Sequence, residues 1–212
     1  QDKSRAIDVV YNYGTFDFNA PGFAVKFLRG KLEYFLSRAP IDSFLREYQY
    51  GQRYVREQEL DITYAEKVAF FQALEENLKK ENRMYQYDFF FDNCVTRIRD
   101  KSEEVFGEID YGNTVDEEMS FRDLLHSHLK PHAWTEFGMD LILGVGTDQK
   151  AGARGQMFLP SYYARYVSNA SIDGESFVGN EASILEFPSV EQTPKFWTPL
   201  RLFISLFFLE II

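Results

Sequence analysis

The feature of this sequence that limits the fold most is its single cysteine, because one cysteine in 212 residues cannot form an internal disulfide. The fold must therefore be held by a hydrophobic core. Hydrophobic residues make up 45% of the chain, which is enough to bury such a core in one large domain or in one domain with an appendage. The 21 Phe and 13 Tyr are explained most simply by packing, although some could line an apolar groove or meet a membrane surface.

The charge of the chain argues against nucleic acid as a partner. The formal net charge is −10, and a protein that binds phosphates needs clustered Lys and Arg side chains. The three histidines, His126, His128 and His132, do not have the spacing of a zinc site with supporting Cys or carboxylate ligands. No metal and no cofactor is predicted.

Hydrophobic periodicity predicts an α+β fold, because strands and helices interleave along the chain. Strands are expected at residues 8–13, 31–37 and 53–60, with a late strand pair at 175–187 broken at Gly179-Asn180. Helices are expected at residues 21–30, 41–48, 93–106, 121–129, 133–143 and 159–168.

The clearest helix begins after Thr63. Thr63 and Glu66 have the spacing of a capping box, and a hydrophobic face then follows as far as Lys79. Its apolar positions are Val68, Phe71, Leu74 and Leu78. This pattern predicts a helix that packs one face on the core.

Cys94 lies at the start of the helix expected at residues 93–106, with Asp92 as its predicted N-cap and Gly107 just past its end. A cysteine in this position faces unpaired N–H groups and the positive end of the helix dipole, and both favour the thiolate. We therefore interpret Cys94 as a nucleophile. The alternative is an inert cysteine in the core, since free Cys is among the most buried residue types.

A thiol nucleophile also needs a base, which is normally a histidine. His126 and His128 lie on opposite sides of the helix expected at residues 121–129, so at most one of them could face a site on another element. His132 follows Pro131 in a connection. Each of the three is more simply interpreted as a structural or surface residue.

The end of the chain differs from the rest. Residues 196–212 are apolar apart from Arg201 and Glu210 and a few small polar positions, whereas a spanning helix needs ~20 apolar residues. We interpret this segment as the start of a transmembrane helix, and a helix that docks on the domain is the alternative. The polar start of the chain has no signal-peptide features, so either there was none or it has been removed.

Five segments together have a familiar pattern. They are Tyr11 to Phe18 with Pro21 and Phe23, Arg53 with residues 57–60, Tyr85 to Phe90, Asp92 to Asp100, and Trp134 to Gly144. They resemble the Lnb-type periplasmic domain, a family that includes the lipoprotein N-acyltransferase of Bacteroides-like bacteria. The Asp-Asn-Cys-x-Thr-Arg-x-Arg-Asp segment of residues 92–100 is the most specific part.

The resemblance implies a circularly permuted papain-like cysteine-enzyme fold with additional helices. It also implies a histidine that precedes the cysteine in the chain, in a Gly-His segment just before the strand at residues 8–13 and ahead of Gln1. Residues 1–195 would then form a periplasmic catalytic domain that lacks its N-terminal part. Residues 196–212 would begin the first of several membrane helices, on the periplasmic face of the bacterial inner membrane.

The implied activity is acyl transfer. By resemblance, the Cys94 thiolate takes a fatty acyl chain from a membrane phospholipid as a thioester, and the N-terminal amine of a lipoprotein then removes it. A papain-like hydrolase that cleaves an amide or ester, and a non-catalytic membrane-proximal binding domain, remain alternatives. Transfer and hydrolysis differ only in whether an amine or water reaches the thioester.

The residues around Cys94 have candidate roles of their own. The backbone N–H groups of residues 93–95 could form an oxyanion hole, with capping as the alternative role of Asn93. Asp92 and Arg97 are candidate supporting residues, with a structural ion pair as the more probable role of Arg97. The candidates for an acyl groove are Tyr85, Tyr87 and Phe89, with core packing as the alternative.

Overall fold

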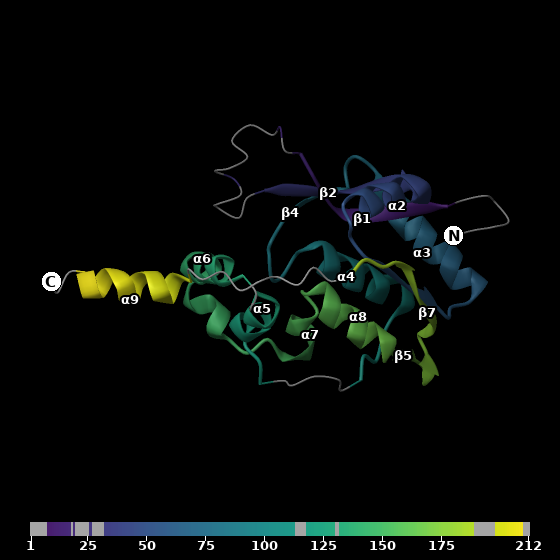
Figure 1. Ribbon diagram of the computed structural model, residues 1–212. Coiled ribbons are helices and arrows are strands. Elements are labelled where there is room, and N and C mark those ends of the chain that lie inside the picture. Colours follow the sequence, from purple (N-terminus) through teal and green to yellow (C-terminus); the bar gives the residue numbers. More distant parts are fainter. Residues whose placement is uncertain are drawn as a thin grey trace. The chain divides into compact units, whose positions relative to one another are not determined.

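The computed structural model of the protein describes residues 8–17, 19, 26, 32–112, 118–129, 132–188 and 198–209 (Figure 1). The described residues form two compact units. Unit 1 draws on residues 1–114 and 157–187, and unit 2 on residues 115–156 and 188–212. The helix predicted at residues 21–30 lies outside the described residues, apart from Lys26.

Unit 1 contains antiparallel sheets, as the predicted α+β fold requires. One sheet has the order β1 (Val9–Phe16), β2 (Glu33–Pro40) and β4 (Met84–Gln86). A second pairs β3 (Val55–Leu60) with β7 (Val178–Leu185), and a third pairs β5 (Ser171–Ile172) with β6 (Glu175–Ser176). The strands predicted near residues 8–13, 31–37 and 53–60 are confirmed, and the permuted papain-like arrangement stays a prediction.

The late strand pair was predicted with the wrong turn. β7 continues through Gly179-Asn180 with a shift in register, because Asn180 pairs with Glu59 of β3, Val178 pairs with Leu60, and Gly179 lies between the two pairs. The hairpin lies earlier, between β5 and β6, and its turn residues Asp173 and Gly174 have φ values of 52° and 84°. Asp-Gly is a preferred pair for such a turn because both central residues need positive φ.

The helices of unit 1 agree closely with the sequence pattern. They are α2 (Ile41–Tyr50), α3 (Tyr64–Leu78), α4 (Cys94–Phe106) and α8 (Pro160–Ser168). The capping box of α3 is confirmed, because the Glu66 N–H donates to the Thr63 hydroxyl and the Thr63 N–H donates to the Glu66 carboxylate at 2.7 Å. The predicted cap of α4 is wrong by one residue, since Asn93 takes that position and Asp92 pairs with Arg97 instead.

One hydrophobic cluster lies where the β1–β2–β4 sheet meets α3 and α4. Tyr13, Leu36 and Tyr85 are buried at its centre. The buried tyrosines keep hydrogen bonds: the Tyr85 hydroxyl donates to the Tyr13 carbonyl at 2.5 Å, and the Tyr13 hydroxyl donates to Asn77 at 2.6 Å. Part of the aromatic excess is therefore core packing, and α4 is attached to this core along β1.

Unit 2 is helical in its described part. Its elements are α5 (Phe121–Leu129), α6 (Ala133–Leu143), the 3₁₀-helix η1 (Val145–Asp148), α7 (Gly152–Gln156) and α9 (Pro199–Leu209). The bounds of α5 and α6 are those predicted. Arg122 of α5 connects these elements, because it pairs with Asp140 of α6, lies 2.6 Å from Asp148 and donates to the Gly144 carbonyl at 2.8 Å.

Among the helices of the described ranges, none has both the length and the apolar character needed to cross a bilayer. α9 has 11 described residues, Pro199–Leu209. The transmembrane interpretation of residues 196–212 and the domain boundary at residue 195 stay predictions.

Candidate functional site

Cys94 is the first residue of α4 and faces the β1–β2–β4 sheet of unit 1. Its side chain is partly buried and packs against the Tyr13, Leu36 and Tyr85 cluster. β1 passes close by, since a Cβ atom added to Gly14 would lie 4.0 Å from the Cβ of Cys94. The thiol therefore lies at the junction of a helix start and a sheet.

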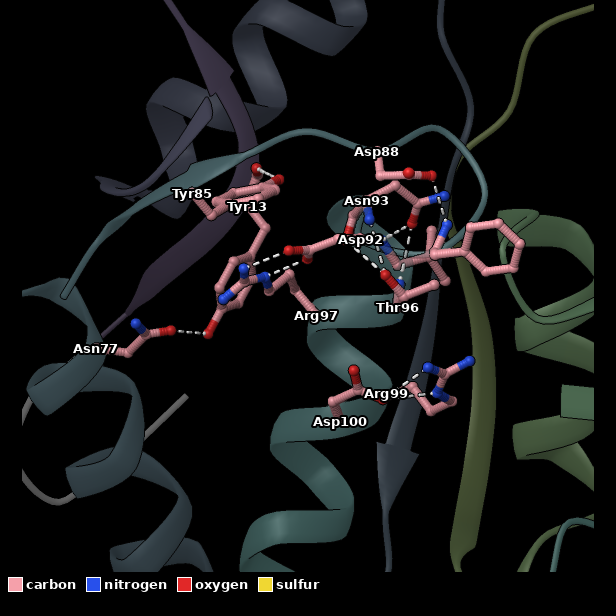
Figure 2. Close-up of polar contacts among 12 residues, drawn as sticks. Tyr13, Asn77, Tyr85, Asp88, Asp92, Asn93, Thr96, Arg97, Arg99 and Asp100 are labelled. Atoms are coloured by element: carbon pink, nitrogen blue, oxygen red, sulfur yellow. Dashed lines mark hydrogen bonds and ion pairs between the residues drawn. The ribbon is translucent and has the colours of Figure 1, made fainter. Parts of the chain in front are cut away.

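Asn93 holds this junction in place. Its side-chain oxygen accepts hydrogen bonds from the N–H groups of Val95 at 2.8 Å and Thr96 at 3.0 Å (Figure 2). Its side-chain amide donates to the carbonyls of Phe89 and Phe158, both at 2.9 Å. Asn93 is only 3% exposed, so one buried side chain ties the start of α4 to the turn before it and to the segment that leads into α8.

These bonds determine which backbone N–H groups at the start of α4 could still donate to an oxyanion. The Asn93 N–H donates to the Thr96 hydroxyl at 2.8 Å, and the Val95 N–H is used by the Asn93 side chain. Within the described residues, the Cys94 N–H is the one of the three that no such bond engages. The capping role of Asn93 is thus observed, and the oxyanion role of these amides stays a prediction that now centres on the Cys94 N–H.

Arg97 forms a bidentate ion pair with Asp92, as expected for a structural pair. Figure 2 shows its guanidinium group facing the Asp92 carboxylate, and the same group lies 4.5 Å from the centre of the Tyr85 ring. Arg99 is paired with Asp100, where two guanidinium nitrogens lie 2.8 and 2.7 Å from one carboxylate oxygen. Both arginines are engaged in structural contacts, and a supporting role of Asp92 and Arg97 in catalysis stays a prediction.

A tight turn precedes the thiol. Asp88 and Asp92 exchange backbone hydrogen bonds of 3.0 and 3.1 Å, and the Asp88 carboxylate accepts from the N–H groups of Phe90 and Phe91 at 2.9 and 3.0 Å. The turn holds the Phe91 side chain outward, with 67% of its surface exposed. Sequence reasoning missed Phe91, because nothing in a run of three phenylalanines shows which one faces solvent.

The three groove candidates lie in different environments. Tyr85 is buried and its hydroxyl is engaged with the Tyr13 carbonyl. Phe89 packs against the Phe158 ring, with 5.8 Å between ring centres. Tyr87 is half-buried and stacks on Tyr34 of β2 with 4.2 Å between ring centres. All three rings are thus engaged in packing, and Tyr87 and Phe89 are only partly buried, whereas Tyr85 is buried.

Comparison with protein families matches residues 1–127 to the Lnb N-terminal periplasmic domain. The chain belongs to this family. The match contains Cys94 and the whole Asp92 to Asp100 segment, so the resemblance predicted from the sequence is confirmed. The family's description also supports a periplasmic location. No curated protein and no solved structure matches the chain.

In this Lnb domain the thiol is not as acidic as its position at a helix start predicts. Burial raises the pKa of Cys94 above its usual value, and the N–H groups of Cys94 and Val95 lower it by less. The expected effect of the helix start is thus present, but desolvation by the surrounding side chains outweighs it. A Cys94 nucleophile in the Lnb domain would need a partner that removes its proton.

The histidines all belong to unit 2 and none to the unit that holds Cys94. His126 lies 3.0 Å from Asp140 of α6 and 3.8 Å from Glu136. Burial acts to raise the pKa of Asp140, but its hydrogen bonds with His126 and Arg122 outweigh this and lower it. His126 therefore has a structural role between α5 and α6, in agreement with the interpretation from the sequence.

Proposed function

We propose that Cys94 is the nucleophile of an acyltransferase that moves a fatty acyl chain from a membrane phospholipid to the N-terminal amine of a lipoprotein. The observation that carries the proposal is the placement of Cys94 at a helix start held by the buried Asn93 cap. A nucleophile must be held in one geometry for attack, and a fully hydrogen-bonded buried cap provides this. Membership of the Lnb family supports the same assignment.

The reaction has two steps at one sulfur atom. In the first, the Cys94 thiolate attacks the ester carbonyl of the phospholipid, a C–S bond forms, and the C–O bond breaks. The leaving alkoxide takes the proton that the general base removed from the thiol and departs as a lysophospholipid. In the second, the amine nitrogen attacks the thioester, a C–N bond forms, and the C–S bond breaks to restore the thiol. The Cys94 N–H is the helix-start amide that could donate to the developing oxyanion.

The raised pKa of Cys94 makes a general base necessary for the first step. The proposal assigns this role to a histidine ahead of β1, as the family resemblance implies. β1 passes next to Cys94 at Gly14, so the chain that leads into this strand is joined to an element of the site.

The apolar acyl chain needs apolar surface beside the sulfur. Tyr34 and Tyr87 stack on one another and pack at the edge of the cluster that contains Cys94. Phe91, held outward by the turn that precedes Cys94, adds a second apolar side chain. We propose that Tyr87 and Phe91 contact the acyl chain. We also propose that the C-terminal segment attaches the protein to the inner membrane, which supplies the phospholipid.

The proposal is tested by incubating the full-length protein with vesicles of phosphatidylethanolamine and phosphatidylglycerol and measuring the intact mass. We expect the mass of one fatty acyl group on Cys94, which neutral hydroxylamine removes as expected for a thioester. The Cys94→Ala variant should carry no such adduct. Ser102→Ala on the same helix is the matched control and should be acylated like the parent.

A second addition separates transfer from hydrolysis. A diacylated lipopeptide with a free α-amine should remove the acyl group from Cys94 and become triacylated, whereas the same lipopeptide with an acetylated amine should not. Release of free fatty acid at equal rates with both peptides would indicate a hydrolase. An adduct that persists in Cys94→Ala would exclude Cys94 as the nucleophile.

A further inference from the structure

α6 of unit 2 carries an uncharged apolar face. Trp134, Leu141 and Ile142 fall on one side of the helix, and Val145 follows just beyond its end, after Gly144. Leu141, Ile142 and Val145 are 70%, 66% and 85% exposed, and Trp134 is 42% exposed. Side chains of this kind are normally covered in a folded protein, so a patch of them indicates a binding surface.

The charged side chains of α6 lie on the opposite side of the helix. Asp140 pairs with Arg122 and His126 of α5, and Glu136 lies 3.8 Å from His126. These contacts hold both carboxylates toward α5. The exposed face of α6 is therefore free of negative charge, even though the chain as a whole has a net charge of −10.

α9 contacts α6 and also carries exposed apolar side chains. The Phe203 ring packs against Phe137 of α6, with 5.6 Å between ring centres. Leu200, Phe203, Ile204 and Phe207 follow the spacing of a helix face, and each is at least 47% exposed. In the described part of the chain, these two helices and Val145 hold more than half of the exposed large apolar side chains.

We infer that the apolar face of α6, together with that of α9, lies against the surface of a lipid bilayer. This inference rests on the proposed membrane attachment and adds α6 to it. A protein partner would need polar groups spread across the interface, about one hydrogen bond per 100–200 Å², whereas acyl chains need none. Trp134 lies toward the N-terminal end of the α6 face, and indole rings favour the boundary between acyl chains and headgroups.

Trp134 gives a direct test, because it is one of two tryptophans in the chain. In the full-length protein in which Trp197 and any tryptophan outside these 212 residues are replaced by Phe, vesicles of phosphatidylethanolamine and phosphatidylglycerol should shift the fluorescence of Trp134 to shorter wavelength. Phospholipid with brominated acyl chains should quench it. The double variant Leu141→Glu/Ile142→Glu should lose this quenching, whether or not the C-terminal segment still holds the protein on the vesicle.

The matched control is Tyr50→Glu/Tyr54→Glu, which adds the same charge at two exposed aromatic positions of unit 1. It should leave quenching of Trp134 and vesicle binding unchanged. Protein that binds vesicles without quenching of Trp134 would show attachment through α9 alone, and would overturn the inference. Dimers in sedimentation that the Leu141→Glu/Ile142→Glu variant abolishes, without quenching by lipid, would make this face an interface between two copies and would also overturn it.

The mass of the Cys94 adduct is measured separately on the same samples. Quenching of Trp134 without an acyl adduct would support the inference about α6 and contradict the proposed function. An acyl adduct without quenching of Trp134 would support the proposed function and contradict the inference about α6.

Discussion

Helices α3 and α4 begin with the same hydrogen-bond pattern in different surroundings. At α3, Thr63 and Glu66 exchange side-chain and backbone bonds at an exposed helix start. At α4, Asn93 and Thr96 exchange the same kinds of bonds, but they are only 3% and 1% exposed. The start of α4 also has two bonds that α3 lacks, from the Asn93 amide to the carbonyls of Phe89 and Phe158.

This difference shows that a local sequence signal determines the pattern of a cap, whereas its surroundings determine what the cap does. Water replaces the lost bonds of an exposed cap, so removing one costs about 1 kcal/mol. A buried cap leaves its partners without bonds, and each of these costs about 1–3 kcal/mol. The start of α4 is therefore held much more firmly than that of α3, and it is the one that carries Cys94.

The largest expected effect is that of Asn93→Ala. Removing this side chain leaves two carbonyls and two N–H groups without their partner, so we expect the free energy of unfolding to fall by at least about 4 kcal/mol. Thr63→Ala should lower it by about 1 kcal/mol. Urea unfolding of both variants measures the two values.

Asn93→Asp separates the two halves of the cap, because it keeps an acceptor for the Val95 and Thr96 N–H groups but cannot donate to Phe89 and Phe158. It should also be clearly destabilising. Equal losses for Asn93→Ala and Thr63→Ala would mean that burial adds nothing to the α4 cap, and would contradict the comparison.

A smaller effect is expected for Thr96→Val, which removes a hydroxyl without changing the shape of the side chain. The Asn93 N–H then loses its acceptor in a buried position, so the free energy of unfolding should fall by about 1–2 kcal/mol. Glu66→Gln, the matched change at the exposed α3 box, should cost less than about 0.5 kcal/mol. The same urea experiment measures both, and a larger loss at Glu66 would reverse the ranking of the two caps.

A third test compares thiols at the first residue of each helix. Cys94 occupies this position in α4, and the 66% exposed Tyr64 occupies it in α3. We expect the thiol introduced by Tyr64→Cys, in a Cys94→Ala background, to react with iodoacetamide about tenfold faster at pH 8 than Cys94 does in the parent chain. Burial raises the pKa of Cys94 and limits access to it, whereas an exposed helix start favours the thiolate.

The pH dependence of the two rates checks the cause. The rate of alkylation of Cys94 should keep increasing up to a higher pH, before it levels off, than the rate at position 64. A Cys94 rate that levels off at the lower pH of the two would show that the helix start outweighs burial, as the sequence alone had suggested.

The features that could be predicted from the sequence are local ones. α3 follows from Thr63, Glu66 and a hydrophobic face, all within about four turns, and its bounds were predicted almost to the residue. The position of Cys94 at a helix start was predicted from residues 92–107 in the same way. Family membership was predicted from motifs of similar length.

The errors arose where distant residues decide between similar local signals. Asp92 and Asn93 are both good N-cap residues, and Asn93 is the cap because its amide reaches the carbonyl of Phe158, 65 residues away, while Arg97 takes Asp92. Gly179-Asn180 has a turn signal, but β3 pairs through it. The pairing of β3 with β7 shifts in register at Gly179, so this glycine marks an irregularity within a strand and not a turn.

The raised pKa of Cys94 could not be predicted from the sequence for the same reason. The helix dipole is visible in residues 93–96, but the desolvation comes from side chains of other elements packed around the thiol. The exposure of Phe91 also depends on how the turn from Asp88 to Asp92 is oriented on unit 1.

The smallest expected effect is a different response of the two caps to low pH. Hydrogen bonds from the Thr63 hydroxyl and the Thr63 N–H lower the pKa of Glu66. Its contribution to stability is therefore complete above the pKa of an unfolded Glu, about 4.3, and is lost as the pH falls through the lower pKa of the folded state. The corresponding residue of α4 is Thr96, which does not titrate, so acid should loosen the start of α3 and leave that of α4 intact.

Amide signals in NMR spectra recorded from neutral to acidic pH make this visible. The Thr63 and Glu66 amides, which take part in the exposed box, should shift with a midpoint below about pH 4.3, whereas the Val95 and Thr96 amides, which donate to the uncharged Asn93 side chain, should shift less in that range. Glu66→Gln should remove the transition at α3 and leave the α4 amides unchanged. If all four amides moved together in the parent chain, acid would be acting on unit 1 as a whole, and the two caps would not differ in the way their surroundings imply.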